Sequence, residues 1–342
     1  MPSGWGALSH VQDSPLLRGE ELEERYNWRK GITGNMEKHA IVIVTYNRAA
    51  LLQECLEAAE SQSQPYDWIV VVDNASTDGT EQLLNQKRSD SRYVIHREKE
   101  NIGGSGGFAR GVKEAYDTGA DWVTIIDDDA ILTENFLEEM KKAAEEDRGE
   151  YLCYAGVPLT DGIRPGHRRR VVGKWIKKER PVPVSEYEQE RFFCDIASFC
   201  GLMVHREVIR KIGFPEERFF IWYDDTEYCL RIAKETKIVN INRAVIQHKV
   251  PAAQPSKSFV GWKDYYGIRN RIFMAGKHYG KLTALYITAK KILRCLLECT
   301  KSAVRGNFGE VSKEFWLYGR GIRDGFAGNL GIHDIYYPGR MK

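Results

Sequence analysis

The chain has 342 residues and a nearly balanced charge, with 50 Lys or Arg against 48 Asp or Glu, so we expect no nucleic-acid partner. Its seven cysteines form no C-x-x-C pair and lie mostly in apolar or helical stretches, which indicates reduced thiols of a cytoplasmic protein. The sequence has neither an export signal nor the run of about 18 apolar residues that crosses a bilayer, so we expect only peripheral membrane contact.

Residues 1–38 are polar and punctuated by glycine, and we expect a flexible N-terminal lead without an assigned function. From residue 40 onward, apolar strands alternate with amphipathic helices. Strands are predicted at 40–45, 67–73, 92–98 and 121–127, and helices at 49–62, 79–88, 108–118 and 133–146. This alternation predicts an α/β domain over residues 39–250, in which helices cover a mostly parallel central sheet.

The alternation stops after residue 242, and the rest of the sequence has helical periodicity. Helices are predicted at 262–279, 281–304 and 310–326. We therefore expect a helical C-terminal extension over residues 251–342.

Polar or glycine-rich segments follow the predicted strands of the α/β domain. In open sheets of this kind, ligands bind beyond the carboxyl ends of the strands. Four segments are therefore expected to meet at one crevice, namely 46–48, 73–76, 103–107 and 127–129.

Three consecutive acids, Asp127, Asp128 and Asp129, directly follow an apolar strand. Adjacent carboxylates repel one another unless a cation or strong hydrogen-bond donors offset their charge. Hard divalent cations such as Mn²⁺ and Mg²⁺ bind carboxylate and phosphate oxygens, so the motif predicts a metal site. The alternative is a helix N-cap, for which one acid would suffice and which Thr133 already provides.

Glycines occupy positions 103, 104, 106 and 107, and we expect them to precede the helix at 108–118. Glycine lets backbone N–H groups approach a ligand, and a helix start favours an anion. Such a run is as common in tight turns as in phosphate sites. It does not follow the first strand, as the glycines of dinucleotide-binding folds do, which disfavours a dehydrogenase.

Two adjacent acids, Asp224 and Asp225, lie where an aromatic run enters a predicted helix, and Glu227 follows them. One interpretation is that these are first-turn acids favoured by the helix dipole. The other is that one of them is a general base, which takes the proton from an attacking hydroxyl. The residue types alone favour neither. His248 by itself is expected to be a packed or surface residue.

Taken together and in this order, the motifs resemble those of family 2 glycosyltransferases of the GT-A fold, most closely the bacterial galactofuranosyl- and rhamnosyltransferases. The matching segments are VTYNR (44–48), VVDNASTDGT (71–80), NIGGSGGFARG (101–111), DDD (127–129), WYDDTEYCLR (222–231) and His248. The resemblance covers residues 40–270. It implies a GT-A-type nucleotide-diphospho-sugar transferase fold.

The resemblance also implies roles for individual residues. The residues that match the donor pocket are Thr45, Asn47, Arg48, Asp73, Asn74, Asp128, Gly103, Gly104 and Arg110. The implied metal ligands are Asp127, Asp129 and His248. Asp225 matches the catalytic base. The acceptor-side candidates are Trp222, Tyr223 and Asp224.

The implied function is an inverting, metal-dependent transfer of one sugar from a nucleotide-diphosphate donor to a hydroxyl of a cell-surface polysaccharide or lipid-linked glycan. Galactofuranose from UDP-galactofuranose is favoured, with rhamnose from dTDP-rhamnose as the alternative. Mycobacterial polymerising galactofuranosyltransferases carry a β-rich domain before the catalytic one, for which this chain has no room, so we expect no repeated polymerisation. The motif at 222–225 also differs in spacing from the Trp-Asp-Asp of that subgroup.

Two rival functions come from other classes. A nucleotidyltransferase that makes nucleotide sugars also uses acidic metal ligands, but resembles a glycine-rich loop with Arg and Lys where this chain has TYNRAALL (45–52). A non-catalytic sugar-binding module would keep the fold only. The intact acids and His248 disfavour that module.

Two segments predict contact with an anionic membrane surface. Residues 164–180 contain eight Lys or Arg against one acid. Over 281–306, a helix would gather apolar residues on one face and keep Lys290, Arg294 and Lys301 off it, as in interfacial helices. That face comprises Leu282, Leu285, Ala289, Ile292 and Leu296. The alternative is that it packs on the catalytic domain or on a second copy in a homo-oligomer. We expect a cytoplasmic protein, peripheral on the inner face of the cell membrane.

Overall fold

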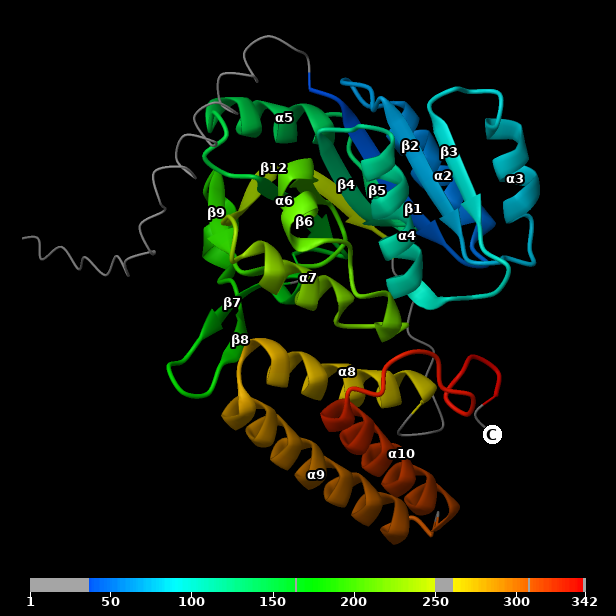
Figure 1. Cartoon of the computed structure of the whole chain (residues 1–342), viewed down its shortest axis with the longest axis vertical. Helices are drawn as coiled ribbons and strands as arrows, with labels where there is room; N and C mark the ends of the chain where they lie inside the picture. The colour runs from blue at the N-terminus through cyan, green and yellow to red at the C-terminus, as the bar shows by residue number, and fades with distance from the viewer. Residues whose placement is uncertain (1–36, 164, 250–260, 307, 341–342) are drawn as a thin grey trace, which may run out of the picture. The chain divides into compact units, whose positions relative to one another are not determined.

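The structure is a computed structural model that describes residues 37–163, 165–249, 261–306 and 308–340. Within it, Lys38–Lys342 form one compact unit (Figure 1). The predicted lead therefore lies almost wholly outside the described residues, and so does the predicted boundary at 250.

In the described chain, nine strands form the central sheet, in the order β3-β2-β1-β4-β11-β6-β12-β5, with β9 beside β12. The strands are β1 (His39–Thr45), β2 (Trp68–Asp73), β3 (Tyr93–Arg97), β4 (Trp122–Asp127), β5 (Ala130–Leu132), β6 (Cys153–Leu159), β9 (Arg191–Cys194), β11 (Leu202–His205) and β12 (Ile238–His248). β1 to β4 pair in parallel, as β6 and β12 do, whereas β5, β9 and β11 pair antiparallel. The α/β fold with a central sheet is confirmed, and the sheet is parallel where strands alternate with crossover helices.

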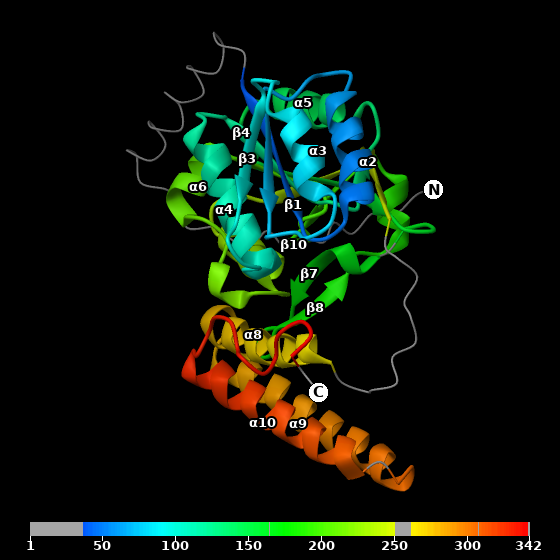
Figure 2. The ribbon, with the colours of Figure 1, turned by 90° about the vertical axis from the view of Figure 1, so that its right-hand side faces the viewer.

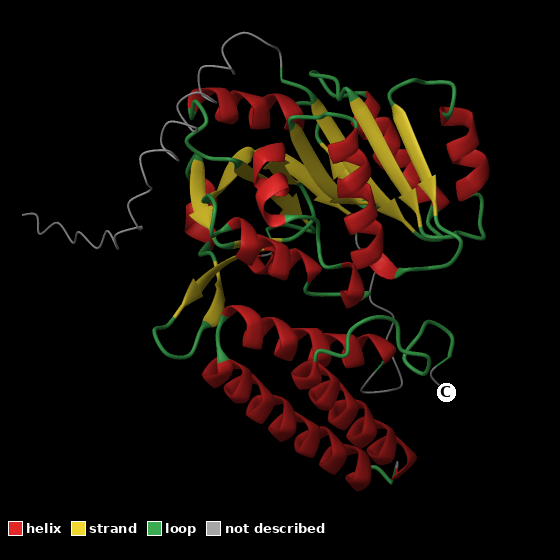
Figure 3. Ribbon diagram, in the orientation of Figure 1, coloured by secondary structure: helices red, strands yellow, loops and turns green. Residues whose placement is uncertain are grey.

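Helices cover both faces of this sheet (Figure 3). They are α2 (Ala49–Glu60), α3 (Thr80–Lys87), α4 (Gly103–Asp117), α5 (Phe136–Glu146), α6 (Arg206–Ile212) and α7 (Asp224–Ile232). Val42 and Val44 of β1 belong to the apolar cluster on the α4 side, while Ile41 and Ile43 belong to the cluster with α2 and α5. Because successive strand residues point to opposite faces, the apolar residues 40–44 of β1 are buried on both sides of the sheet.

The helix predicted at 108–118 begins earlier, at Gly103, so the glycine run forms the first turns of α4 and does not precede it. Local composition argued against a helix here because glycine is a poor helix former. Tertiary packing overrides that preference, since a Cβ on Gly107 would lie 2.5 Å from Cγ1 of Val44 and one on Gly111 would meet Val42. The glycines thus let α4 lie directly on β1.

A small sheet and three helices complete the described chain. The sheet has the order β10-β7-β8, with β7 (Arg168–Val172), β8 (Lys178–Pro181) and β10 (Ile196–Ala197). The helices are α8 (Trp262–His278), α9 (Lys281–Val304) and α10 (Phe308–Ala327), which confirms the predicted helical C-terminal region. Figures 1 and 2 both show α8 next to the α/β part, with α9 and α10 beyond it. Among the described helices, none combines the length and apolar character needed to cross a membrane.

Candidate active site

The end of β4 and the turn after it hold the three consecutive acids. Asp128 and Asp129 are buried. Because β1 pairs with β4, the last residue of β1 and the loop after it reach these carboxylates. Thr45 Oγ1 donates to Asp128 Oδ2 at 2.8 Å, and one Arg48 nitrogen lies 3.0 Å from Asp128 Oδ1 and 2.9 Å from Asp129 Oδ2. Arg48 therefore offsets part of the charge of both acids.

His248 joins this cluster through strand pairing. It lies at the end of β12, where the antiparallel register sets it opposite Ala130, next to the acids. Ligand atoms of Asp127, Asp129 and His248 all lie within 4.8 Å of one another. Thr160 Oγ1 lies 3.4 Å from Nδ1 of His248, and so leaves Nε2 on the side of Asp129, 3.3 Å from its Oδ1. Two carboxylates and an imidazole held by a second partner fit the donor set of a divalent cation.

The pKa values of the acids depend on their neighbours. Burial raises the pKa of Asp127 well above its usual value, and the charges of Asp129, Asp128 and Asp224 add to this rise. Burial also raises the pKa of Asp128, against the opposing effects of Arg48 and Thr45. For Asp129, burial is outweighed by His248 and Arg48, and its pKa is lowered. A carboxylate like Asp127 becomes ionised more readily when a cation lies beside it.

The predicted nucleoside-side residues form a connected loop structure beside the cluster. Asp73 Oδ1 accepts a hydrogen bond from the Ser76 amide at 2.9 Å, and Ser76 Oγ accepts one from the Asn47 amide at 2.9 Å. Asn74 Nδ2 donates to the Gly103 carbonyl at 3.1 Å, which ties β2 to the start of α4. The structure thus brings Asn47, Asp73 and Asn74 together with Thr45 and Arg48, as the sequence predicted for the ends of β1 and β2.

A cavity of about 320 Å³ lies beside the acids of α7. Both Asp225 and Asp127 line it. Its other lining residues are Gly104, Ser105, Phe108, Ser198, Phe199, Ile221, Trp222, Tyr223 and Asp224. Asp225 is half-buried, and its Oδ1 accepts hydrogen bonds from the amide and hydroxyl of Thr226, which orient the carboxylate. Asp224 is more deeply buried, and burial followed by the charge of Asp225 raises its pKa.

Three further candidate residues have structural contacts within the protein. Arg110, a predicted donor-pocket residue, pairs with Glu98 and Glu114. Gly103 has a φ of +79°, and a Cβ there would clash with the Phe220 carbonyl, so its conformation and packing require glycine. Glu227, the third acid of the α7 motif, is buried and bonded to Lys277, His278 and Arg231, which makes it a structural ion-pair residue.

The loop at 219–223, just before α7, has an unusual backbone. Phe220, Trp222 and Tyr223 have φ values of 66°, 67° and 71°, in the left-handed region that residues with side chains rarely adopt. Such residues cost about 1–3 kcal/mol each and persist only where neighbours hold them. Trp222 and Tyr223, two of these residues, line the cavity beside Asp225.

Side chains of helix α8 hold the loop at 219–223 in this conformation. Asn270 Nδ2 donates to the carbonyls of Phe219, Ile221 and Trp222, at 2.9, 3.0 and 3.0 Å. Arg269 donates to the carbonyls of Arg218 and Phe219, both at 3.1 Å. The sequence motifs do not include these two residues. Their only local signal is a polar pair on the helix face that also carries the buried Tyr265, Tyr266 and Ile272.

The model of glycosyl transferase family 2 matches residues 40–213. The chain is similar to galactofuranosyltransferase GlfT1 of Mycolicibacterium smegmatis, with 28% identity over 196 residues, which are 56% of this chain and 64% of that protein. It is also similar to dTDP-rhamnosyl transferase RfbF of Shigella flexneri, with 26% identity over 217 residues, 61% of this chain and 65% of that protein. Each match spans less than two thirds of the relative.

Solved structures share the fold. Mannosyltransferase PcManGT from Pyrobaculum calidifontis, in complex with GDP-Man and Mn²⁺, matches with a TM-score of 0.50 and 16% identity, over 90% of this chain and 95% of that one. GalNAc-T7 with UDP, GalNAc and Mn²⁺ matches with a TM-score of 0.53 and 15% identity, over 74% of this chain and 53% of that one. At these identities the likeness shows the fold.

The α8 hydrogen bonds lead to a testable prediction. Asn270→Ala should lower the free energy of unfolding by about 1–3 kcal/mol, because it leaves carbonyls of a strained loop without their donor. Hydrogen exchange of the segment around 218–224 should become faster, while exchange in β1 and β4 stays slow. Asn85→Ala, at an exposed position of α3, is the matched control and should change neither quantity. Unchanged exchange in Asn270→Ala would contradict the assigned role.

Proposed function

Because this chain belongs to glycosyl transferase family 2, we propose that it is an inverting, metal-dependent glycosyltransferase that moves one sugar from a nucleotide-diphosphate donor to an acceptor hydroxyl. The observation that carries the proposal is the cavity lined by both Asp225 and Asp127. Asp225, the proposed base for the acceptor, and Asp127, a carboxylate of the candidate metal cluster, therefore line the same cavity. A hydroxyl and a donor sugar bound there would face each other.

Asp225 is the proposed catalytic base. It takes the proton of the acceptor hydroxyl as that oxygen attacks the anomeric carbon, and the nucleoside diphosphate leaves from the opposite side. This single displacement inverts the anomeric centre and needs no covalent enzyme intermediate. The hydrogen bonds from Thr226 hold the carboxylate, and Trp222 and Tyr223 form the acceptor side of the cavity.

The proposed metal ligands are Asp127, Asp129 and His248. A bound Mn²⁺ or Mg²⁺ supplies positive charge opposite the departing diphosphate. Arg48 pairs with Asp128 and Asp129 and so offsets part of the charge beside the proposed ligands. The support is the donor set and the 4.8 Å spacing of its ligand atoms.

The nucleoside of the donor is proposed to bind to residues at the ends of β1 and β2, namely Thr45, Asn47, Arg48, Asp73 and Asn74. Asp128 lies between Thr45 and Arg48 and is bonded to both. Gly104 lines the cavity and is proposed to face the donor sugar. Galactofuranose from UDP-galactofuranose is the favoured sugar, in line with the 28% identity to GlfT1. Rhamnose from dTDP-rhamnose is the alternative, in line with the 26% identity to RfbF.

We further propose that the protein works on a cell-surface glycan at the inner face of the membrane, bound through α9. The predicted apolar face of this helix is exposed, with Leu282 at 60%, Leu285 at 56% and Leu296 at 59%. The opposite face of α9 is the one that packs in the protein, so these side chains are free to meet a bilayer. Lys290, Arg294 and Lys301 flank the exposed face and complement an anionic lipid surface.

The role of Asp225 is tested by an assay for released nucleoside diphosphate, run with UDP-galactofuranose and dTDP-rhamnose as donors. Asp225→Asn should lower turnover by about 10²–10⁴-fold, the usual cost of losing a general base, and leave donor binding unchanged. Asp90→Asn, which alters a surface acid paired with Arg92, is the control and should keep full turnover. Near-normal turnover in Asp225→Asn would reject the assignment.

The metal site is tested by calorimetry with UDP and dTDP, with and without Mn²⁺. Asp127→Ala and Asp129→Ala should each weaken Mn²⁺-dependent nucleotide binding by at least about tenfold, because each removes an oxygen ligand. Asp117→Ala, at an exposed acid paired with Lys113, should bind as the wild type does. Wild-type activity that is insensitive to EDTA would refute metal dependence.

The membrane proposal is tested by flotation with vesicles of phosphatidylglycerol or phosphatidylcholine. The protein should float with the anionic vesicles at low salt and less at high salt, because salt screens the basic residues. Leu285→Gln/Leu296→Gln should abolish flotation, since each leucine contributes about 1.5–3 kcal/mol of apolar burial. Val184→Gln, at an exposed residue outside α9, should float normally. Absence of wild-type flotation with both lipids would remove the proposal.

A further inference from the structure

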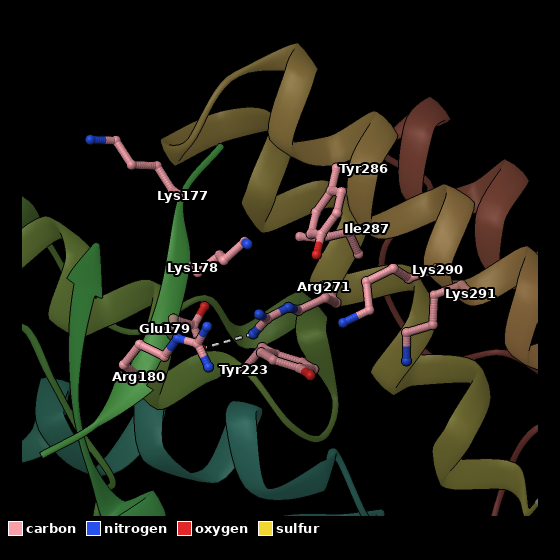
Figure 4. A pocket seen from close by; sticks show the side chains of 10 residues that line it. All are labelled: Lys177, Lys178, Glu179, Arg180, Tyr223, Arg271, Tyr286, Ile287, Lys290 and Lys291. Atoms are coloured by element: carbon pink, nitrogen blue, oxygen red, sulfur yellow. Dashed lines mark hydrogen bonds and ion pairs between the residues drawn. The ribbon is translucent and has the colours of Figure 1, made fainter. Parts of the chain in front are cut away.

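A second cavity, of about 420 Å³, is surrounded by positive charge. It lies between the β7–β8 hairpin and helices α8 and α9 (Figure 4). Six of its lining residues are cations, namely Lys177, Lys178, Arg180, Arg271, Lys290 and Lys291. Only one lining residue, Glu179, is an acid.

Glu179 offsets only part of the charge of this group of cations, through its ion pair with Arg271. Its side chain is 4% exposed, and its Oε2 is bonded to Arg169 at 2.5 Å and to Arg271 at 2.9 Å. Tyr279 donates to its other oxygen at 3.1 Å. The carboxylate is therefore already shared by two arginines. In the described part of the chain, Lys178, Lys290 and Lys291 form no ion pair with an acid.

The cations converge on one space. Lys178 and Lys290 come from β8 and α9, yet their ammonium groups lie 5.6 and 5.7 Å from the centroid of the same ring, that of Tyr286. Figure 4 shows the ends of Lys178, Lys290 and Arg271 directed toward one hollow, whereas Lys177 extends away from it. Burial, with the charges of Arg294 and Arg271, lowers the pKa of Lys291, as expected where like charges crowd. Converging cations around a hollow favour an anion.

Tyr223 connects this cavity to the candidate active site. It lines both the basic cavity and the cavity that contains Asp225. The guanidinium of Arg271 lies over its ring, 5.2 Å from the centroid. None of Asp127, Asp129 and Asp225 lines the basic cavity, so an anion there is not the donor diphosphate held at the metal cluster.

We propose that the basic cavity is the subsite for a phosphate or diphosphate group carried by the acceptor. The hydroxyl of that acceptor reaches Asp225 on the other side of Tyr223. The inference rests on the proposed transferase function and names the chemical class of the acceptor, a glycan or lipid-linked glycan with a phosphate near the sugar that is extended. Lys178, Lys290 and Arg271 bind the anion, and Tyr286 holds the two lysines in place.

The test is titration of the full chain with inorganic pyrophosphate by calorimetry, in EDTA and without donor. Under these conditions the acidic cluster has no cation with which to bind the probe. The wild type should bind pyrophosphate. Lys178→Gln/Lys290→Gln should bind it at least about tenfold more weakly, because hydrogen bonds between charged groups contribute more than 1.4 kcal/mol. Lys113→Gln/Lys211→Gln removes two exposed lysines elsewhere and should bind as the wild type does.

The source of the phosphate is tested with the single variant Lys178→Gln, which lies on β8 and leaves α9 intact. It should bind pyrophosphate more weakly than the wild type and still float with phosphatidylglycerol vesicles. Loss of flotation in this variant, together with displacement of the wild type from vesicles by pyrophosphate at matched ionic strength, would assign the cavity to a lipid headgroup and overturn the proposal.

Two further outcomes separate this proposal from the transferase function. No pyrophosphate binding by the wild type, or equal binding by both double variants, would overturn the subsite and leave the assignment of Asp225 intact. Normal turnover in Asp225→Asn with pyrophosphate binding that depends on Lys178 would instead reject the base and leave an anion site in need of another role.

Discussion

Like charges are crowded at the end of β4, and the candidate site is organised around the groups that offset them. Asp127 is half-buried, and Asp128 and Asp129 beside it are buried, where unpaired carboxylates are costly. Arg48 forms an ion pair with Asp128, and Thr45 donates a hydrogen bond to it. His248 lies beside Asp129. Burial and the charges of Asp129 and Asp128 keep the pKa of Asp127 raised, and the charge of Arg48 opposes this rise only in part. The protein's own donors thus cover two of the three acids, and a divalent cation is the natural partner for the remaining charge.

The helical C-terminal region takes part in the site. Phe220 of the 219–223 loop belongs to the apolar cluster formed by α8, α9 and α10, and Asn270 and Arg269 bond the carbonyls of the same loop. Three left-handed residues store strain that those contacts offset. Tyr223 and the acids of α7 follow directly, so the position of Asp225 depends on α8 as well as on the sheet.

The side chain of Tyr223 lies between a group of acidic residues and a group of basic residues. The acids of β4 and α7 lie on one side of Tyr223, and the lysines of β8 and α9 lie on the other. In the proposed reaction this division suits two anions with different needs. The donor diphosphate leaves beside a bound metal, whereas the acceptor phosphate stays bound by cationic side chains. A single wall between the two spaces keeps the acceptor hydroxyl close to Asp225 and its phosphate away from the acidic cluster.

The sequence alone determined the alternating strands and helices up to β4, the three C-terminal helices and the order of the acidic motifs, because each is encoded in the spacing of neighbouring residues. Only the tertiary structure decided which distant residues meet. His248 reaches Asp129 because β12 pairs with β5, and the glycine run became helix because α4 lies on β1. Asn270 reaches the loop before α7, and Lys178 meets Lys290 over Tyr286, across more than 40 and 100 residues of chain. Such contacts depend on packing between elements, and no local period records them.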